Sequence, residues 1–226
     1  MTQQTVRLDI VSDVMCPWCY IGKRRLETAM ALVPHIAFDI RWRPFQLDPT
    51  IPPEGMDRQT YLEAKFGPER AKAVYGDIEA AGAGAGIAFD FAAITRSPNT
   101  IDAHRLIRWA GDAGCQDAVV ERLFEFFFLK GQDIGDRKHL VSIAADCGMD
   151  AEWVREHLDS DTDKDKVQRE IAIAQAIGIQ GVPGFIFENA YLVSGAQAPE
   201  SLADAAQRAA NAPAKAGQPS PFDAKA

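Results

Sequence analysis

The chain has 226 residues, of which 47% are hydrophobic and 25% charged, a composition typical of ordinary globular proteins. This length allows one large domain, or one domain interrupted by a second. The formal net charge is −8, and no lysine- or arginine-rich stripe is present, which argues against a surface that follows nucleic-acid phosphates. We therefore expect a folded protein without a nucleic-acid partner.

The N-terminal residues 1–5 lack the basic region and the apolar stretch of ~7 to 15 residues that a secretory signal requires. No apolar run in the sequence has the length of a membrane span. We expect a cytoplasmic protein that does not associate with membranes. In a reducing compartment, closely spaced cysteines more often serve catalysis or metal binding than structural cross-linking.

Cys16 and Cys19 lie between a predicted strand and a predicted helix. Residues 6–11 alternate in the manner of a strand, and apolar residues after the cysteines recur at helical spacing. The motif, with Pro17 and Trp18 between the cysteines, therefore lies at a helix N-terminus, where free N–H groups and the helix dipole stabilise a thiolate. Since Cys19 lies one turn further along, it can reach the sulfur of Cys16. We assign Cys16 as the attacking thiol and Cys19 as the resolving thiol.

A zinc site is the alternative interpretation of a Cys-x-x-Cys motif. Structural zinc sites normally add a second such pair or two closely spaced histidines. Cys115, Cys147 and the four scattered histidines supply neither, so we predict no metal. Cys147 ends a buried helical stripe and is expected to be an inert core thiol, whereas Cys115 is expected in a loop, with a structural or incidental role.

The chain opens in the order strand, helix, strand, because residues 36–42 again alternate between apolar and polar. The cysteines then fall where the first strand meets the helix, a place where α/β sheets often carry their chemistry. Four prolines between residues 44 and 53 exclude a regular element and predict an extended connection. A domain boundary is expected there.

Residues 56–178 are predicted to form an all-helical insertion domain. Helical patterns cover residues 61–66, a segment beginning at residue 68, and residues 103–110, 117–131, 140–147, 150–158 and 167–174. Glycines 82, 84 and 86 follow no strand and precede no Lys-Ser/Thr pair, so they predict a helix end and not a phosphate loop. The phenylalanine-rich run 124–129 is predicted to be buried, with a hydrophobic groove as the alternative.

Strand-like patterns return after Gly178. Residues 184–187 and 191–194 predict a hairpin, and Pro199 opens a final helix. Together with the Cys-x-x-Cys motif, the order of elements predicts an α/β fold: a thioredoxin fold interrupted by a large all-helical insertion domain. Residues 1–55 and 179–211 would form the thioredoxin-like domain, and residues 212–226, rich in Ala and Pro, a flexible tail.

With these elements in place, the chain resembles the DsbA family of thioredoxin-fold proteins, and within it the cytoplasmic FrnE-like branch. The resemblance spans residues 6–209. It rests on Ser12-Asp13 ahead of Cys16-Pro17-Trp18-Cys19-Tyr20-Ile21-Gly22-Lys23, on Arg43-Pro44-Phe45-Gln46-Leu47, on Pro98-Asn99-Thr100 with Ala103-His104-Arg105-Leu106, on Gly178-Ile179-Gln180-Gly181-Val182-Pro183, and on Ser194-Gly195-Ala196-Gln197. It implies a thiol:disulfide oxidoreductase that needs no cofactor and acts on proteins or small molecules carrying thiols or disulfides.

The resemblance also implies a cis peptide bond between Val182 and Pro183, beside the cysteines. The Val182 backbone would pair with an extended substrate, and Pro183 would keep metals off the dithiol. Many relatives carry threonine where Gly184 stands, which leaves the polarity and rigidity of this wall open. The other residues expected to line the substrate cleft are Phe45, Gln46, Asn99 and His104. A structural role is favoured for His104 over that of a proton shuttle.

Two other functions stay open. Kappa-class glutathione transferases and 2-hydroxychromene-2-carboxylate isomerases share the inserted architecture, but they generally carry serine where Cys16 stands. Retention of both cysteines therefore favours redox exchange in this chain, and glutathione stays open as a cosubstrate. The third hypothesis is a non-catalytic redox sensor or protein-binding module. The direction of exchange and the oligomeric state, with a homodimer as one option, are not determined by the sequence.

Overall fold

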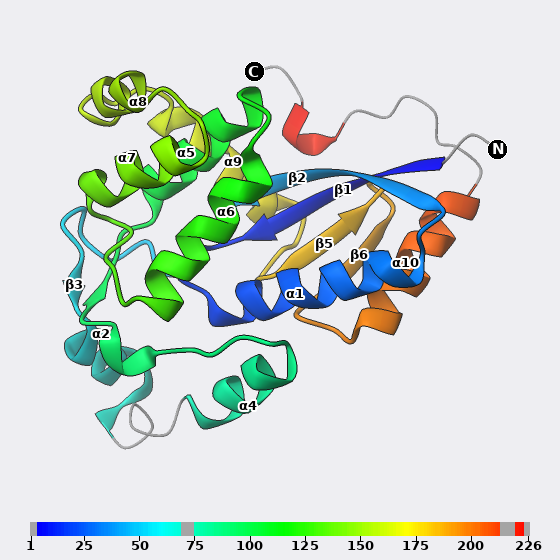
Figure 1. The fold of residues 1–226 in the computed structure, drawn as a ribbon, viewed down its shortest axis with the longest axis horizontal. Coiled ribbons are helices and arrows are strands. Elements are labelled where there is room, and N and C mark those ends of the chain that lie inside the picture. Colours follow the sequence, from blue (N-terminus) through cyan, green and yellow to red (C-terminus); the bar gives the residue numbers. More distant parts are fainter. Residues whose placement is uncertain (1–3, 69–74, 213–219, 224–226) are drawn as a thin grey trace.

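The computed structural model describes residues 4–68, 75–212 and 220–223. A four-stranded sheet forms the centre of one half of the molecule, and a mainly helical part covers one end of that sheet (Figure 1). This is the thioredoxin arrangement with a helical insertion that the sequence predicts. In the described ranges, no helix is long and apolar enough to cross a membrane.

The sheet has the strand order β2-β1-β5-β6. Strand β1 (Gln4–Ser12) pairs in parallel with β2 (Ile36–Pro44) and antiparallel with β5 (Gly184–Phe187), and β5 pairs with β6 (Tyr191–Ser194). Because β1 is an interior strand, it is buried from residue 8 to its end. The predicted hairpin of β5 and β6 is confirmed.

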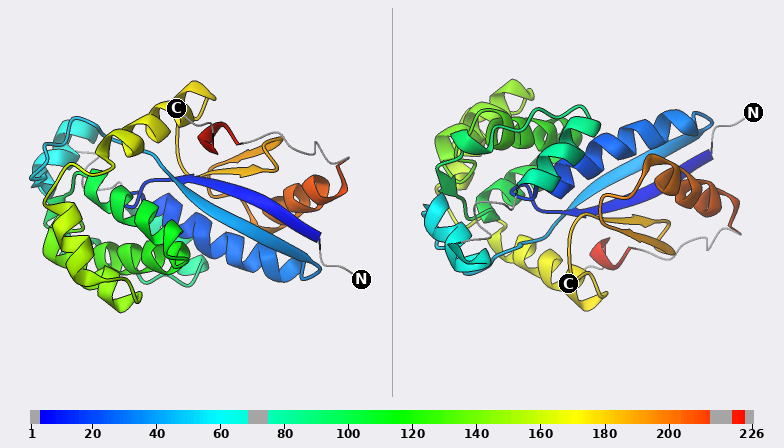
Figure 2. Two further views of the ribbon diagram at one scale, coloured as in Figure 1. Left: turned by 90° about the horizontal axis from the view of Figure 1, so that it is seen from above. Right: turned by 90° about the horizontal axis from the view of Figure 1, so that it is seen from below.

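Helices cover both faces of the sheet. Helices α1 (Pro17–Leu32) and α10 (Pro199–Asn211) pack together on one face, whereas α9 (Lys164–Ala176) and the short helix η3 (Pro221–Asp223) lie on the opposite face (Figure 2). Helix α1 begins directly after Cys16 because Pro17 occupies its first turn, where the missing N–H leaves no hydrogen bond unmade.

The insertion carries the remaining elements. They are β3 (Met56–Asp57), α2 (Arg58–Phe66), α4 (Gly76–Gly84), η1 (Phe91–Ala93), β4 (Arg96–Ser97), α5 (Ile101–Asp112), α6 (Gln116–Phe124), η2 (Glu125–Leu129), α7 (Arg137–Asp146) and α8 (Ala151–Leu158). The antiparallel pair β3–β4 was not predicted, since two residues per strand show no periodicity. Most of the segment expected to be helical from residue 68 lies outside the described residues.

The phenylalanine-rich run forms part of the core. In place of one helix over residues 117–131, α6 ends at Phe124 and a five-residue π-helix, η2, follows. Phe124, Phe127 and Phe128 are fully buried, which confirms the core interpretation for these three residues, while Phe126 and Leu129 are half-buried. Tyr20 of α1 stacks on Phe124 with ring centroids 4.9 Å apart. The run thus packs the insertion against the helix that follows Cys16.

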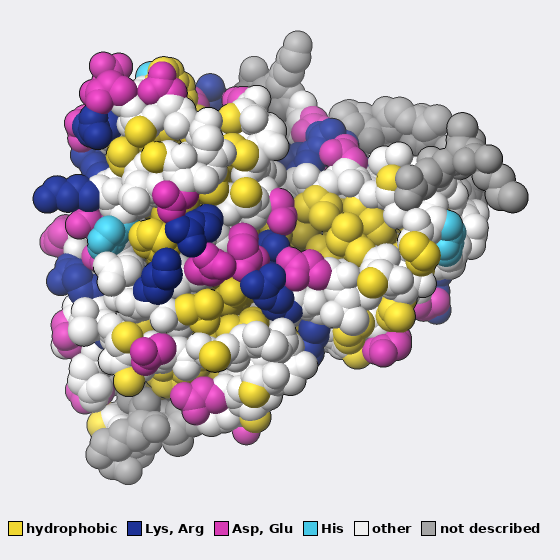
Figure 3. Space-filling model, viewed as in Figure 1, with side chains coloured by type: hydrophobic (Ala, Val, Ile, Leu, Met, Phe, Trp, Pro, Cys, Tyr) yellow, Lys and Arg dark blue, Asp and Glu magenta, His cyan; other side chains and the backbone are white. Residues whose placement is uncertain are grey.

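Ion pairs reinforce the same boundary between α1 and α6. Lys23 of α1 is only 4% exposed, and its ammonium lies 2.6 Å from Glu27, 3.0 Å from Glu121 and 3.2 Å from Asp117. Charged side chains gather over α6 and its border with α1 (Figure 3). Because a buried ammonium is costly without partners, Lys23 favours one relative position of the two helices.

The free edge of strand β2 is occupied by a side chain. The Gln116 amide accepts a hydrogen bond from the Trp42 backbone N–H at 2.9 Å and donates one to the Trp42 carbonyl at 3.3 Å. Gln116 therefore supplies the two hydrogen bonds that a neighbouring strand would make with this residue.

The C-terminal residues differ from expectation. Ser220 and Phe222, within the predicted flexible tail, are 1% and 8% exposed and pack against the sheet. That part of the prediction is wrong, because Phe222 finds an apolar site and Asp223 meets arginine side chains. Residues 213–219 and 224–226 of the predicted tail lie outside the described residues.

The stacked aromatic boundary generates the first prediction. Phe124→Ala should lower the free energy of unfolding by about 3–5 kcal/mol, because a fully buried phenylalanine leaves a cavity. Phe66→Ala, at a position 37% exposed, is the control and should stay within about 0.5 kcal/mol of the parent. Urea unfolding curves measure both. Equal losses in the two variants would contradict this account of the boundary.

Candidate active site

The two cysteines of the motif occupy the first turn of α1. Cys16 is the N-cap residue of α1, and its backbone N–H donates to the Asp13 carbonyl at 3.0 Å. The Cys19 N–H donates in turn to the Cys16 carbonyl at 3.0 Å. Cys16 and Cys19 are 4% and 1% exposed, whereas Trp18 between them is 36% exposed. The motif therefore places an exposed indole beside a shielded pair of thiols.

The two thiols differ in their surroundings. Burial raises the pKa of Cys19 well above its ordinary value, and the hydrogen bond and charge of Cys16 raise it further. A hydrogen bond with Ser12 and another with the Asp13 backbone act in the opposite direction but do not outweigh these effects. Cys19 is thus held as a neutral thiol near pH 7, a property suited to a second, resolving step.

The loop before β5 lies beside the first cysteine. The Val182–Pro183 peptide bond is cis, and the Cys16 thiol donates to the Val182 carbonyl at a sulfur–oxygen distance of 3.8 Å. A β-carbon added at Gly184 would lie 3.4 Å from Ile179, an ordinary contact, so the departure from threonine does not by itself change the backbone path.

Gly22 permits the close approach of α1 to this loop. A β-carbon at Gly22 would lie 2.9 Å from Cγ of Pro183 and 3.2 Å from the ring of Phe185. Both distances are too short for ordinary packing. Glycine is therefore favoured one turn after Cys19, and the spacing Cys-x-x-Cys-x-x-Gly is the signal that marks it in the sequence.

Asp13 joins the strand end to the connection after β2. Its carboxylate is fully buried and accepts the Leu47 backbone N–H at 2.8 Å. His104 Nε2 lies 3.6 Å from the same carboxylate and 2.8 Å from the Phe45 carbonyl. Asp13 was not predicted to have a role; a carboxylate directly after the first strand, three residues before Cys16, was the available signal.

Gln46 and Asn99 form a second set of side-chain hydrogen bonds to the connection after β2. The Gln46 amide donates to the Asn99 side chain at 3.4 Å, and Asn99 donates to the Ile51 carbonyl at 2.7 Å. Asn99 also accepts the Ile101 backbone N–H at 3.1 Å. These bonds fasten the proline-rich connection to the start of α5. A direct role for either side chain in substrate binding stays a prediction.

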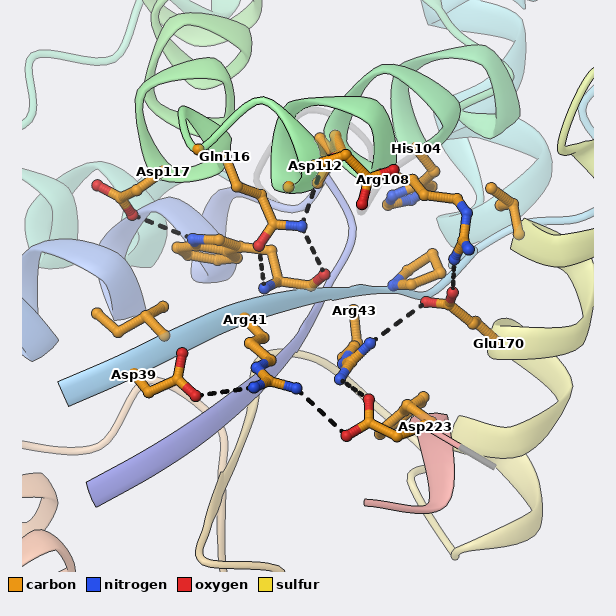
Figure 4. Close-up of a pocket in the computed structure, with 18 residues that line it drawn as sticks. Asp39, Arg41, Arg43, His104, Arg108, Asp112, Gln116, Asp117, Glu170 and Asp223 are labelled. Carbon is orange, nitrogen blue, oxygen red and sulfur yellow. Dashed lines mark hydrogen bonds and ion pairs between the residues drawn. The ribbon is translucent and has the colours of Figure 1, made fainter. Parts of the chain in front are cut away.

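The structure thus groups the predicted site residues in two sets. Cys16, Cys19, Val182 and Pro183 lie together. Phe45 and His104 are connected to Cys16 indirectly, because His104 contacts both the Phe45 carbonyl and Asp13, and the Asp13 carbonyl accepts the Cys16 N–H. A cavity of 550 Å³ reaches His104, yet neither cysteine nor the cis-proline loop lines it. It is bounded by β2, α5, the start of α6, α9 and η3, and its lining is strongly charged (Figure 4). The dithiol and this cavity are therefore separate features of the structure.

The two remaining cysteines do not take part in this arrangement. Cys115 precedes α6 and Cys147 follows α7, and both are half-buried, so Cys147 is less deeply buried than the sequence analysis expected. Burial raises the pKa of both thiols. Among the residues that the structure describes, no group of three or more His, Cys, Asp and Glu side chains could hold a metal ion.

Comparison with known proteins identifies the family. The model of the DSBA-like thioredoxin domain matches residues 7–207. The chain is a DsbA-family protein. It is 34% identical to a probable DsbA oxidoreductase from Streptomyces coelicolor, with a TM-score of 0.81 over 90% of this chain and 89% of that one. The DsbA-like family to which it belongs is one of thiol:disulfide oxidoreductases.

Two further proteins are similar to this DsbA-family chain. The uncharacterized protein YwbO of Bacillus subtilis is 26% identical over 183 residues, 80% of this chain and 86% of that protein. A 2-hydroxychromene-2-carboxylate isomerase is 15% identical, with a TM-score of 0.67 over 89% of this chain and 95% of that one. At that identity, the likeness to the isomerase shows the fold alone.

Contact between Gly22 and Pro183 generates a prediction. Gly22→Ala should destabilise the fold by about 1–3 kcal/mol, because the added methyl group overpacks the contact and outweighs the better helix propensity of alanine. Gly84→Ala at the end of α4 is the matched control, since nothing lies within 4 Å of the added atom. It should be neutral or stabilising. Thermal unfolding of both variants checks this, and a stabilised Gly22→Ala protein would contradict the packing argument.

The raised pKa of Cys19 predicts that this thiol reacts slowly with alkylating reagents. In the folded, reduced protein, iodoacetamide should leave Cys19 unmodified near pH 7 and label it only at a higher pH than an unfolded cysteine needs, because burial raises the pKa of its thiol. Mass spectrometry of the labelled peptides follows each cysteine separately. Labelling in concentrated urea, where burial is lost, is the control and should modify Cys19 readily. Rapid labelling of Cys19 at pH 7 in the folded protein would refute the assignment.

Proposed function

We propose that this protein exchanges disulfides with its substrates through Cys16, with Cys19 as the resolving thiol. The proposal rests on how the two thiols are placed. The Cys16 thiol lies at the N-terminus of α1, 3.8 Å from the Val182 carbonyl, and the Cys19 thiol is buried, which raises its pKa. Such an arrangement supports two successive steps, in which one sulfur meets the substrate first and the other follows.

In the reductive direction, the Cys16 thiolate attacks one sulfur of a substrate disulfide. A Cys16–substrate disulfide forms, and the other substrate sulfur leaves as a thiolate that takes up a proton. Cys19 then loses its proton and attacks the Cys16 sulfur, which releases the second substrate thiolate. The substrate gains two electrons and two protons, and the protein is left with a Cys16–Cys19 disulfide. The oxidative direction is the reverse of these steps.

The backbone beside the dithiol suggests how a substrate is held. We propose that the Val182 backbone pairs with an extended segment on either side of the substrate cysteine, while Pro183 forms the wall opposite Cys16 and the half-exposed Trp18 forms the rim. The substrate is a protein or small molecule that carries a thiol or disulfide. Glutathione would serve as the thiol cosubstrate that restores the dithiol, in a cytoplasmic protein of the FrnE-like branch.

Replacement of the attacking thiol tests the chemistry. Cys16→Ser should abolish the catalysed reduction of insulin by dithiothreitol, because a hydroxyl cannot form the mixed disulfide. Turbidity from the separated insulin chains reports the rate. Cys147→Ser, which removes a half-buried thiol outside the site, should keep the parent rate. An unchanged rate in Cys16→Ser would exclude the proposed reaction.

Removal of the resolving thiol should instead trap the intermediate. Cys19→Ala leaves the Cys16–substrate disulfide with no internal nucleophile, so it should accumulate in a cell lysate. Non-reducing gels followed by mass spectrometry would identify the trapped proteins, and Cys16→Ser/Cys19→Ala should trap none. If the single variant trapped nothing either, a redox sensor or binding module would be the better account.

The isomerase is the second candidate function, because a 2-hydroxychromene-2-carboxylate isomerase has the same fold. Fold alone does not separate the two, but the thiol at position 16 favours redox exchange over small-molecule isomerisation. Turnover of a chromene carboxylate in the presence of glutathione, retained or enhanced in Cys16→Ser, would favour the isomerase.

A further inference from the structure

A small apolar cluster lies beneath the dithiol site, separate from the main core. Its buried members are Val11, Phe45, Ala174, Ile179, Ile186 and Phe222, and Leu47, Ile173 and Val182 pack against it. Three of the contributing segments lead directly into the site: the end of β1, the connection after β2, and the loop that contains the cis-proline. The cluster therefore holds these segments from below.

Phe222 comes to this cluster from the C-terminal end of the chain. It is 8% exposed, and the Arg43 guanidinium lies over its ring at 4.9 Å from the centroid. Two residues earlier, the Ser220 hydroxyl donates to the fully buried Asp9 carboxylate at 3.2 Å. The segment is thus bound to the sheet by an aromatic side chain in an apolar site and by a buried hydrogen bond.

Asp223 also binds the C-terminal segment to the sheet, through ion pairs. Its carboxylate lies 2.7 Å from Arg7, 3.1 Å from Arg43 and 3.2 Å from Arg41, so three arginines from β1 and β2 converge on it. Its contacts with Arg41 and Arg43 are drawn in Figure 4. Burial alone would raise the pKa of Asp223, but Arg7 and Arg43 outweigh it and hold the pKa below its ordinary value. The carboxylate is therefore ionised, and the attachment complete, throughout the neutral range.

We propose that Phe222 is a positioning residue for the dithiol site: the C-terminal segment Ser220–Asp223 sets the place of the Ile179–Pro183 loop and, through it, of the Val182 carbonyl beside Cys16. The inference rests on the proposed exchange reaction and adds to it the element that orders the substrate-facing backbone. A loop supported by few apolar side chains depends strongly on the largest of them, and Phe222 and Phe45 are the only aromatic rings among the cluster's described members.

The test compares four variants of the full-length chain in the reduction of a fluorescent peptide disulfide. Phe222→Ala should raise KM by about fivefold or more with a smaller change in kcat, because the binding backbone is displaced while both cysteines remain. Phe222→Leu should restore most of the loss, since it refills the apolar site. Asp223→Asn should raise KM by a smaller factor. Asp204→Asn, in an exposed pair with Arg208, should leave KM unchanged.

A measurement without substrate separates positioning from general stability. Amide hydrogen exchange over residues 179–182 should be faster in Phe222→Ala than in the parent. Val154→Ala, in the core at α8, loses stability by a comparable mechanism and should leave both this exchange and KM unchanged. Parent-like exchange in that loop, or a parent-like KM in Phe222→Ala, would overturn the inference.

The exchange reaction at Cys16 and the positioning role of Phe222 can be disproved separately. If Cys16→Ser keeps full activity, the exchange reaction itself is wrong, whatever Phe222 does. If Cys16→Ser is inactive but Phe222→Ala binds and exchanges like the parent, only the role of the C-terminal segment is wrong.

Discussion

The close packing of helix α1 against the cis-proline loop is the contact on which the rest of the site depends. The first turn of this helix carries both cysteines, so any shift of its axis moves the sulfurs relative to the Val182 carbonyl. The missing side chain at Gly22 allows Pro183 to approach the helix so closely that a β-carbon at this position would lie 2.9 Å from its ring and force a shift. The proposed exchange therefore depends on the absence of a methyl group at Gly22, one turn after Cys19.

The helical insertion also fixes the position of α1, through contacts with α6. Lys23 follows Gly22 directly, and its buried ammonium pairs with carboxylates on α1 and on α6. Tyr20 adds a stacked ring against Phe124. Adjacent residues of one helix thus contact the cis-proline loop and the helical domain. The insertion acts as a second support for the dithiol helix and not as a separate appendage.

Local patterns in the sequence were sufficient for the architecture. The alternation in residues 6–11 and 36–42, the helical spacing after Cys19 and the hairpin over 184–194 each arise from side chains close together in the chain, so their periodicity records the element and its buried face. The place of Cys16 at a strand–helix junction followed from the same patterns. The cis bond at Pro183 was expected only through family resemblance, because no local pattern distinguishes it.

Long-range partners could not be predicted in this way. Asp13 meets the Leu47 amide, and Phe222 joins the apolar cluster that contains Ile179, across separations that no periodicity encodes. The composition of the C-terminal residues is that of a mobile tail, and only the folded sheet presents the arginines and the apolar site that Phe222 and Asp223 occupy. For the same reason, the half-burial of Cys147 depends on how neighbouring helices pack and not on its own helical stripe.

The amide of Gln116 on the outer edge of β2 has a consequence beyond the fold. An edge strand with free N–H and C=O groups is a template on which another extended chain can add. At Trp42 both groups are already bound within the same molecule. An added strand would have to break these two bonds before it could pair with β2 at Trp42.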